Sequence, residues 1–318
     1  MSLLIQTPHR PDIARRTPYR RYLNMLSRNE TAVQRALRRG GSGQYETDMQ
    51  ATLLAVCEWL GPDCVFYDVG AHVGYYSAMA ATLFKGVGIR VVAFEPTPDT
   101  ANIARAIRSA NGLDYEIIQA AVADVPGSVE LFLSPKAETS NSLDGTFREG
   151  SVPVTVRAMT IDEYVAGGGP IPNFIKVDVE TFEHAVLIGG MKTIADARPY
   201  LTCEILPTEN FSAMAAVLDR LEDIGYRFYQ ISDAAQWMAH RAADVETNLD
   251  SVLRDWLFLP QEMPTELPEL IASWRSSLEQ CDADTNIGVK SGSILKRTIR
   301  SLKSRRLLRR DWNGDADP

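Results

Sequence analysis

The chain has 318 residues, 45% of them apolar, and is therefore long enough to bury a sizeable hydrophobic core. Its four cysteines are widely spaced and form no CxxC pair, which argues against a disulfide framework or a zinc site. The net charge of −8 hides two basic ends: nine arginines oppose four acids in residues 1–48, and 290–310 hold nine basic residues without an acid. An acidic body between basic ends is atypical of nucleic-acid-binding domains, so we expect no nucleic-acid partner.

Residues 1–46 are rich in arginine and form an N-terminal arm, in which one helix is expected near residues 29–39. The arm lacks the apolar run of a signal peptide, and no apolar run in the chain is long enough to span a bilayer. We therefore expect a cytoplasmic protein. The next helix is expected from Thr47, where Thr47–Gln50 fits the capping-box pattern and apolar residues follow at helical spacing.

From residue 64 onward, apolar strands alternate with helices, and two shorter strands at 129–133 and 152–156 flank a polar loop. This alternation predicts an α/β fold with a mostly parallel, doubly wound, Rossmann-like sheet. No helix suited to a parallel crossover separates the last two strands, so the final strand is expected to be antiparallel. The seven strands of this sheet are expected at residues 64–69, 90–94, 115–122, 174–179, 201–206, 226–231 and 256–259.

A glycine-bearing turn, Asp68-Val69-Gly70-Ala71-His72-Val73-Gly74, lies where the first strand meets the first helix. In open α/β sheets, ligands bind at the carboxyl ends of the strands, and Gly70 would let the backbone approach a ligand closely. Asp68 is placed to accept a hydrogen bond from a ligand ammonium group. Glu95, at the end of the second strand, is placed for the two hydroxyls of a ribose.

The spacing of this turn separates it from a dinucleotide site. Its residues follow D-x-G-x-x-x-G, whereas the dinucleotide pattern G-x-G-x-x-G carries a third glycine. The Asp68 carboxylate would repel a pyrophosphate, but the zwitterionic methionine part of S-adenosylmethionine (SAM) tolerates a neighbouring acid. We therefore expect residues 64–95 to build a SAM pocket.

Six segments recur in the order and spacing of one family and span roughly residues 46–260. They are DVGAHVGYYS, VVAFEPTPD, AAVADVPGSVEL, MTIDEY, IKVDVETFEHAVLIGG and RPYLTCEIL. The chain thereby resembles the FkbM-type SAM-dependent methyltransferases. The resemblance implies a class I methyltransferase fold and, usually, O-methylation of a hydroxyl on a sugar, glycan or natural product. With it, the chain divides into the arm (1–46), a methyltransferase domain (47–260) and a C-terminal extension (261–318).

The resemblance also implies roles for individual residues. The family pattern usually has Asn where this chain has His72, and Gly where it has Thr181. His72 is read either as a partner of the SAM carboxylate region or as a partly exposed loop residue. The remaining cofactor-binding residues follow by position: Asp68, Gly70, Ala71 and Gly74 beside the methionine part, Glu95 at the ribose and Asp124 near the adenine.

Methyl transfer to a hydroxyl requires an aligned acceptor oxygen and a base or metal that helps to remove its proton. Four candidate catalytic residues lie at the end of the fourth main strand: Asp178, Glu180, Glu183 and His184. We expect one of the first two to face the SAM methyl group and one of the last three to be the base. Lys176, in an otherwise apolar strand, needs a partner, for which Asp178 is a candidate. A divalent metal on Asp178, Glu180 and Glu204 stays open, but no metal ligand is assigned.

The C-terminal segment 290–310 is basic and amphipathic. It could contact an anionic membrane at its inner face, or form a solvated tail that packs on the acidic body or on another copy in a homo-oligomer. The expected acceptor is a small molecule or a glycan. Two alternatives stay open beside O-methylation: a SAM-binding scaffold without turnover, and a methyltransferase that acts on a nitrogen or carboxyl acceptor.

Overall fold

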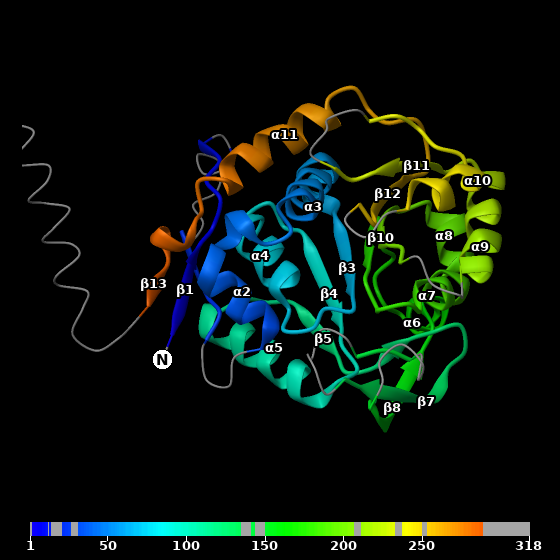
Figure 1. Ribbon diagram of the computed structural model, residues 1–318, viewed down its shortest axis with the longest axis horizontal. Helices are drawn as coiled ribbons and strands as arrows, with labels where there is room; N and C mark the ends of the chain where they lie inside the picture. Colours follow the sequence, from blue (N-terminus) through cyan, green and yellow to red (C-terminus); the bar gives the residue numbers. More distant parts are fainter. Residues whose placement is uncertain are drawn as a thin grey trace, which may run out of the picture.

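The computed structural model of the chain describes residues 2–11, 13, 21–26, 31–134, 141–143, 150–206, 211–232, 237–249 and 253–288. The basic segment 290–310 lies outside these residues. The described part of the chain holds a central sheet, two small sheets and the helices that cover them (Figure 1).

The central sheet has seven strands in the order β11-β12-β10-β9-β3-β4-β5. Strands β3, β4, β5, β9 and β10 pair in parallel, whereas β12 pairs antiparallel with both β10 and β11. The expected mostly parallel sheet with an antiparallel last strand is confirmed, and β12 lies between two strands rather than at the edge. The strands are β3 (Val65–Val69), β4 (Arg90–Phe94), β5 (Glu116–Ile118), β9 (Phe174–Val177), β10 (Tyr200–Glu204), β11 (Arg227–Gln230) and β12 (Asp255–Leu259).

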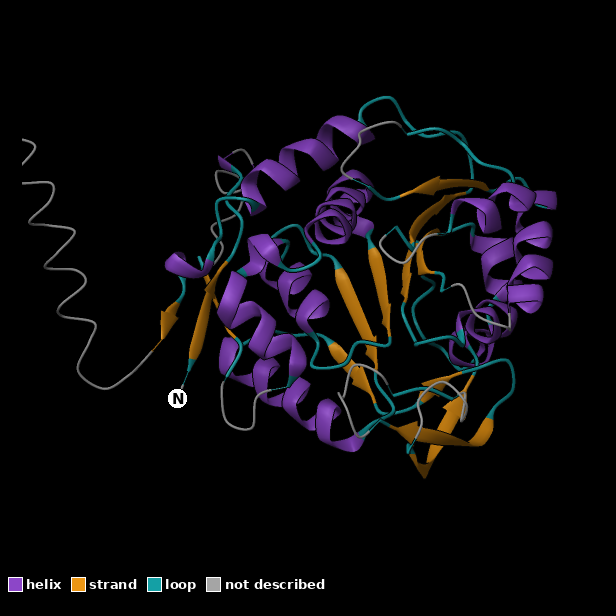
Figure 2. Ribbon diagram, in the orientation of Figure 1, coloured by secondary structure: helices purple, strands orange, loops and turns teal. Residues whose placement is uncertain are grey.

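Helices cover both faces of this sheet (Figure 2), which is why its strands are apolar on both sides. Successive side chains of a strand point to opposite faces, so Phe66 packs into one core and Tyr67 into the other. Among the described residues, no helix combines the length and the apolar character needed to cross a membrane. One face carries α3 (Thr47–Leu60), α4 (Tyr75–Leu83) and α5 (Pro98–Asn111), and the other carries α6 (Ile161–Ala166), α7 (Glu183–Gly189), α8 (Met191–Ala197), α9 (Phe211–Asp223) and α10 (Ala242–Val245).

The third expected strand is wrong as a single element. The segment 115–122 splits into β5 and β6 (Ala121–Val122), because the chain turns where the Ala120 N–H bonds the Ile118 carbonyl at 3.1 Å. Strand β6 then joins a second sheet with β7 (Gly127–Leu133) and β8 (Val152–Met159), in the order β6-β8-β7. An apolar run predicts extended backbone, but it does not reveal a change of sheet.

The N-terminal arm and the C-terminal extension meet in a third sheet. Strand β1 (Leu3–Gln6) lies between β2 (Tyr22–Asn24) and β13 (Ile287–Gly288). Helix α11 (Leu267–Leu278) packs on α3, and Trp274 donates a hydrogen bond to Glu58 Oε2 at 2.7 Å. Both ends of the described chain are thus anchored to the central domain (Figure 1).

The expected helix of the arm is confirmed as α2 (Ala32–Gly40), but the capping box at the start of α3 is wrong. The N-cap residue is Glu46, with φ +42° and no side-chain cap. The Gln50 amide instead donates to the Ser42 carbonyl at 2.8 Å, and the Thr47 hydroxyl donates to the Gly43 carbonyl at 2.7 Å. Both side chains therefore bond the preceding turn, which leaves the Glu46 carboxylate uninvolved in helix capping.

Candidate active site

A cavity of about 410 Å³ lies at the carboxyl ends of the parallel strands. Its lining includes residues at the ends of β3, β4, β9 and β10, together with residues of α2 and of the turn before α3. This edge is where open α/β sheets bind ligands, and the volume suits a small molecule. The sequence therefore predicted the correct edge of the sheet, while the contribution of α2 comes from the tertiary structure.

The turn after β3 approaches the cavity with its backbone. Gly70 has φ +81°, and the N–H groups of Gly70 and Ala71 both donate to the Phe94 carbonyl, at 3.1 and 3.0 Å. Gly70, Ala71 and His72 line the cavity. Gly74 does not line it, because its α-carbon faces α5, where an added Cβ would lie 3.3 Å from the Ala104 Cβ.

Asp68 is fully buried behind this turn and does not line the cavity. Its Oδ2 accepts hydrogen bonds from the backbone N–H and the hydroxyl of Ser77, at 3.1 and 2.6 Å. Burial raises the pKa of Asp68, although the Lys176 ammonium and the Ser77 donors oppose this effect. The carboxylate thus ties the end of β3 to the first turns of α4.

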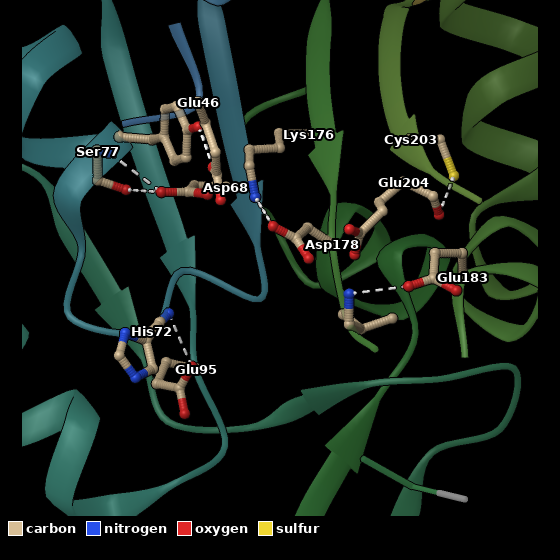
Figure 3. A network of polar contacts seen from close by, with 12 residues as sticks. Glu46, Asp68, His72, Ser77, Glu95, Lys176, Asp178, Glu183, Cys203 and Glu204 are labelled. Carbon is tan, nitrogen blue, oxygen red and sulfur yellow. Dashed lines mark hydrogen bonds and ion pairs between the residues drawn. The ribbon is translucent and has the colours of Figure 1, made fainter. Parts of the chain in front are cut away.

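Glu95 follows β4, and its carboxylate is part of the cavity wall. Its Oε1 accepts hydrogen bonds from the Thr97 N–H (2.9 Å) and the Thr100 hydroxyl (2.7 Å), and its Oε2 accepts one from the His72 N–H (2.8 Å; Figure 3). An ionised carboxylate offers about four acceptor positions, so these three donors fix its orientation and leave room for a ligand hydroxyl. His72 reaches this site through its backbone, at φ +52°.

The buried Lys176 forms an ion pair with the half-buried Asp178, which confirms the expected partnership. The Lys176 Nζ lies 2.7 Å from Asp178 Oδ2 and 5.0 Å from the centre of the Tyr76 ring. Strand pairing places Lys176 opposite Asp68. Burial by itself favours the neutral amine, but the Asp178 and Asp68 carboxylates outweigh it and hold the pKa of Lys176 above its ordinary value.

Two further acids, Glu180 and Glu204, lie beside this pair, and Figure 3 shows Glu204 next to Asp178. Oxygen atoms of Asp178, Glu180 and Glu204 lie within 4.8 Å of one another, and the Arg254 Nε lies 2.6 Å from Glu204 Oε1. Burial, and then the Asp178 charge, raise the pKa of Glu204 to about 10. Burial opposes ionisation of Asp178 too, but Lys176 and the hydrogen bond from Glu204 lower its pKa overall. Lys176 therefore favours the ionised form of Asp178, whereas burial and the Asp178 charge disfavour ionisation of Glu204 and Arg254 opposes them.

The loop after β9 has a strained backbone. Glu180 and Thr181 have φ values of +56° and +84°, and a β-branched residue at positive φ is an outlier. The Ser142 hydroxyl donates to the Glu180 carbonyl at 2.5 Å and lies 3.1 Å from the Thr181 hydroxyl. Thr181 thus occupies a conformation that glycine adopts without strain, which gives a physical reason for the glycine in the family pattern.

Glu183 anchors this loop and does not line the cavity. Its Oε1 accepts hydrogen bonds from the N–H groups of Val179 (3.1 Å) and Thr181 (3.2 Å), and Figure 3 shows the carboxylate turned toward this backbone. Burial raises the pKa of Glu183 to about 7 in spite of these donors.

His184 and Asp124 lie together outside the cavity lining. Asp124 is exposed and packs beside α7, since its α-carbon would lie 3.2 Å from a Cβ on Gly189. His184 is half-buried, and burial lowers its pKa while the Asp124 charge opposes this shift. The structure therefore brings Asp178 and Glu180 to the cavity but not these two residues.

The cavity lining includes charged and aromatic residues that were not selected from the sequence, among them Arg39, Glu46, Tyr76 and Arg254. Tyr76 belongs to the DVGAHVGYYS segment, but an aromatic residue in a helix of small, mostly apolar residues is expected to belong to the core. The other three come from α2, the start of α3 and the residue before β12. No local pattern distinguishes them from solvated charges, because only the fold brings these segments to the cavity.

A family model described as the methyltransferase FkbM domain matches residues 68–228, just over half of the chain. The chain belongs to the FkbM methyltransferase family. The matched stretch of this FkbM member begins at Asp68 and includes the turn, Glu95 and the acid cluster of the cavity wall.

Individual relatives match less of the chain. The hexuronic acid methyltransferase AglP of Haloferax volcanii is 31% identical over 145 residues, which are 45% of this chain and 56% of AglP, so the match spans about half of that relative. The crystal structure of methyltransferase FkbM from Methylobacillus flagellatus KT aligns with a TM-score of 0.40 and 15% identity, over 62% of this chain and 44% of that one. Cofactor-bound Rv0187 from MTB aligns with a TM-score of 0.36 and 12% identity, over 74% and 83% of the respective chains.

Proposed function

We propose that this FkbM member is a SAM-dependent O-methyltransferase that acts on a hydroxyl of a sugar, glycan or natural product. One observation carries the proposal: a single cavity joins the Gly70 turn, the Glu95 carboxylate and the Asp178–Glu204 acid cluster. Family membership supports methyl transfer, and the similarity to AglP supports a sugar-derived acceptor.

The cofactor half of the cavity is the part formed after β3 and β4. We assign the methionine part of SAM to the backbone at Gly70 and Ala71, and a ribose hydroxyl to the free acceptor position of Glu95. Asp68 and Gly74 would support this turn from behind. The adenine is assigned to the apolar wall that Phe94 and Val122 form, since Asp124 lies outside the lining.

When bound, SAM supplies an activated methyl group, and the chain must then align the acceptor oxygen and accept its proton. We assign the base to Glu180, whose side chain lines the cavity. Asp178 is paired with Lys176, and Glu204 is paired with Arg254, so both are weaker bases. Glu183 is engaged with the loop backbone.

The acceptor half of the cavity is covered by α2. Arg39 of this helix is exposed at the cavity, and its guanidinium makes no ion pair or hydrogen bond with another described residue. A guanidinium that is free to bind suits an anionic group on the acceptor, such as the carboxylate of a sugar acid.

The Glu180→Gln variant tests the proposed base. Its affinity for S-adenosylhomocysteine (SAH), measured by calorimetry, should stay within about twofold of the wild type, because Glu180 is not assigned to the cofactor. Methyl transfer from labelled SAM to 4-nitrophenyl β-D-glucuronide should fall by about 10²- to 10⁴-fold. Glu130→Gln is the control, since Glu130 is an exposed acid of β7 outside the cavity.

Full turnover by Glu180→Gln would reject the assignment of the base. SAH binding by the wild type without transfer to any saccharide hydroxyl would instead favour a SAM-binding scaffold. Transfer to amine or carboxylate acceptors alone would replace O-methylation with the other alternative reaction.

A further inference from the structure

Glu46 occupies an unusual position at the start of α3. Short polar side chains at a helix N-cap ordinarily accept a hydrogen bond from the helix backbone, whereas the longer Glu46 side chain makes no such bond. Its carboxylate lines the cavity instead, where its Oε2 accepts a hydrogen bond from the Tyr76 hydroxyl at 2.5 Å. The backbone φ of +42° is strained for a residue with a side chain, and such strain clusters at ligand sites.

The charges of the cavity favour a cationic ligand beside Glu46. Five acidic and three basic side chains line it, and two of the basic ones are engaged, Lys176 with Asp178 and Arg254 with Glu204. Glu46 forms no ion pair with any described residue, and burial together with the Asp178 charge raises its pKa. An incoming cation would therefore stabilise the ionised form of this carboxylate.

Asp68, which the sequence offered for this task, is closed off from the cavity. Its Oδ2 accepts both hydrogen bonds from Ser77. Its Oδ1 has no hydrogen-bond partner among the described residues, but the whole side chain is buried behind the turn and does not line the cavity. Glu46, by contrast, lines the cavity and is tied through Tyr76 to the first turn of α4. That turn of helix follows the Gly70–Gly74 turn, in which the backbone at Gly70 and Ala71 is assigned to the methionine part of SAM.

We propose that the Glu46 carboxylate accepts a hydrogen bond from the α-ammonium group of the methionine part of SAM. The proposal rests on SAM being the cofactor. It adds a cofactor-binding residue that lies 22 residues before Asp68, outside the region matched by the family model. SAM carries an ammonium, a sulfonium and a carboxylate and is a net cation, which matches the excess of acids in the cavity. Tyr76 is the positioning residue that orients the carboxylate.

Two ligands distinguish binding of the ammonium group by Glu46 from a general disturbance of the cavity. SAH has the amino-acid part, whereas 5′-methylthioadenosine retains the adenosine but lacks the ammonium group. In calorimetry on the full chain, Glu46→Gln should weaken SAH binding by about 10- to 100-fold, the range expected for one charge-assisted hydrogen bond. It should leave 5′-methylthioadenosine binding within about twofold. Glutamine keeps an acceptor for the Tyr76 hydroxyl, so the local structure should be retained.

Two matched variants complete the experiment. Glu95→Gln should weaken both ligands, because Glu95 is assigned to the ribose that they share. Asp68→Asn should not lose SAH selectively, because its carboxylate does not reach the cavity. Selective loss of SAH by Asp68→Asn, or equal effects of Glu46→Gln on the two ligands, would overturn the assignment. A wild-type protein that binds neither ligand would reject the SAM cofactor itself and the Glu46 role with it.

Discussion

A β-carbon on Gly70 would lie 1.8 Å from the carbonyl oxygen of Asp178. The two residues follow neighbouring parallel strands, so this approach sets how closely the turn after β3 and the loop after β9 meet. The backbone assigned to the cofactor and the acid cluster assigned to the acceptor are thereby held in one arrangement.

The first prediction is that Gly70→Ala destabilises the fold and abolishes SAH binding. The added methyl group would overlap the Asp178 carbonyl, and alanine is strained at φ +81°. We expect the free energy of unfolding to fall by about 2–4 kcal/mol and SAH affinity to fall more than about 100-fold.

Gly61→Ala is the matched control, because Gly61 also has a positive φ, +72°, but an added Cβ would meet nothing within 4 Å. This variant should lose stability through backbone strain, by about 1–3 kcal/mol, and keep full SAH binding. Denaturant unfolding and calorimetry measure both quantities. Equal SAH binding by the two variants would contradict the proposed contact.

The second prediction concerns the pH dependence of stability. Burial raises the pKa of Glu183 to about 7 in the folded chain, whereas an unfolded glutamate titrates near about 4.3. Between these values the folded state binds more protons than the unfolded state, so the free energy of unfolding falls as pH rises. The Glu183 share of this loss should reach about 3 kcal/mol between pH 5 and pH 8.

Glu183→Gln should remove that share, because glutamine does not titrate, and should make the free energy of unfolding less dependent on pH. The loop should keep its structure, since glutamine still offers an oxygen to the two backbone donors. Guanidinium unfolding at pH 5 and pH 8 measures the difference between variant and wild type. Burial also raises the pKa of Glu204 to about 10 and that of Asp255 to about 7. These two acids should leave a residual dependence of the free energy of unfolding on pH in the variant. Parallel profiles for the two proteins would show that Glu183 does not titrate in this range.

The third prediction is that Arg39→Ala impairs the use of anionic acceptors only. Loss of a charge-assisted contact should raise KM for 4-nitrophenyl β-D-glucuronide by about 10- to 100-fold. The KM for 4-nitrophenyl β-D-glucoside, which lacks the carboxylate, and the affinity for SAH should stay unchanged. Arg38→Ala is the control, because Arg38 is an exposed neighbour on α2 that does not line the cavity. Equal effects on both sugars would argue against carboxylate recognition by Arg39.

The fourth prediction is that turnover does not need a divalent metal. Oxygen atoms of Asp178, Glu180 and Glu204 are close enough to bind one cation, but Lys176 and Arg254 already supply positive charge to this cluster. Methyl transfer in excess EDTA should therefore stay within about twofold of the untreated rate. Loss of activity that added Mg²⁺ restores would instead identify the cluster as a metal site.

Local patterns were sufficient for much of the architecture. Alternating apolar segments predicted the central sheet and its antiparallel last strand, because each strand must bury both faces under helices. The lysine within an apolar strand predicted its own partner, since a buried ammonium needs a nearby carboxylate. Glycine spacing located the turn at Gly70, where φ is positive.

Other features depended on contacts between distant segments. The break between β5 and β6 and the failed capping box at Thr47–Gln50 arise where tertiary hydrogen bonds replace local ones. The direction of each acid was also undecided by spacing, because the positive φ values at Glu180 and Thr181 interrupt the alternation of an extended strand.

The sequence by itself therefore determined the fold and the edge of the sheet that carries the site, since these follow from periodicity and turn chemistry within short segments. The family followed from the resemblance of six ordered segments to the FkbM-type methyltransferases. Only the tertiary structure decided which acids face the cavity. It buried Asp68 behind Ser77, turned Glu183 to the loop backbone and brought Glu46 and Arg39 over the strand ends. The physical reason is that access to a cavity depends on how separate elements pack, and no single segment encodes that packing.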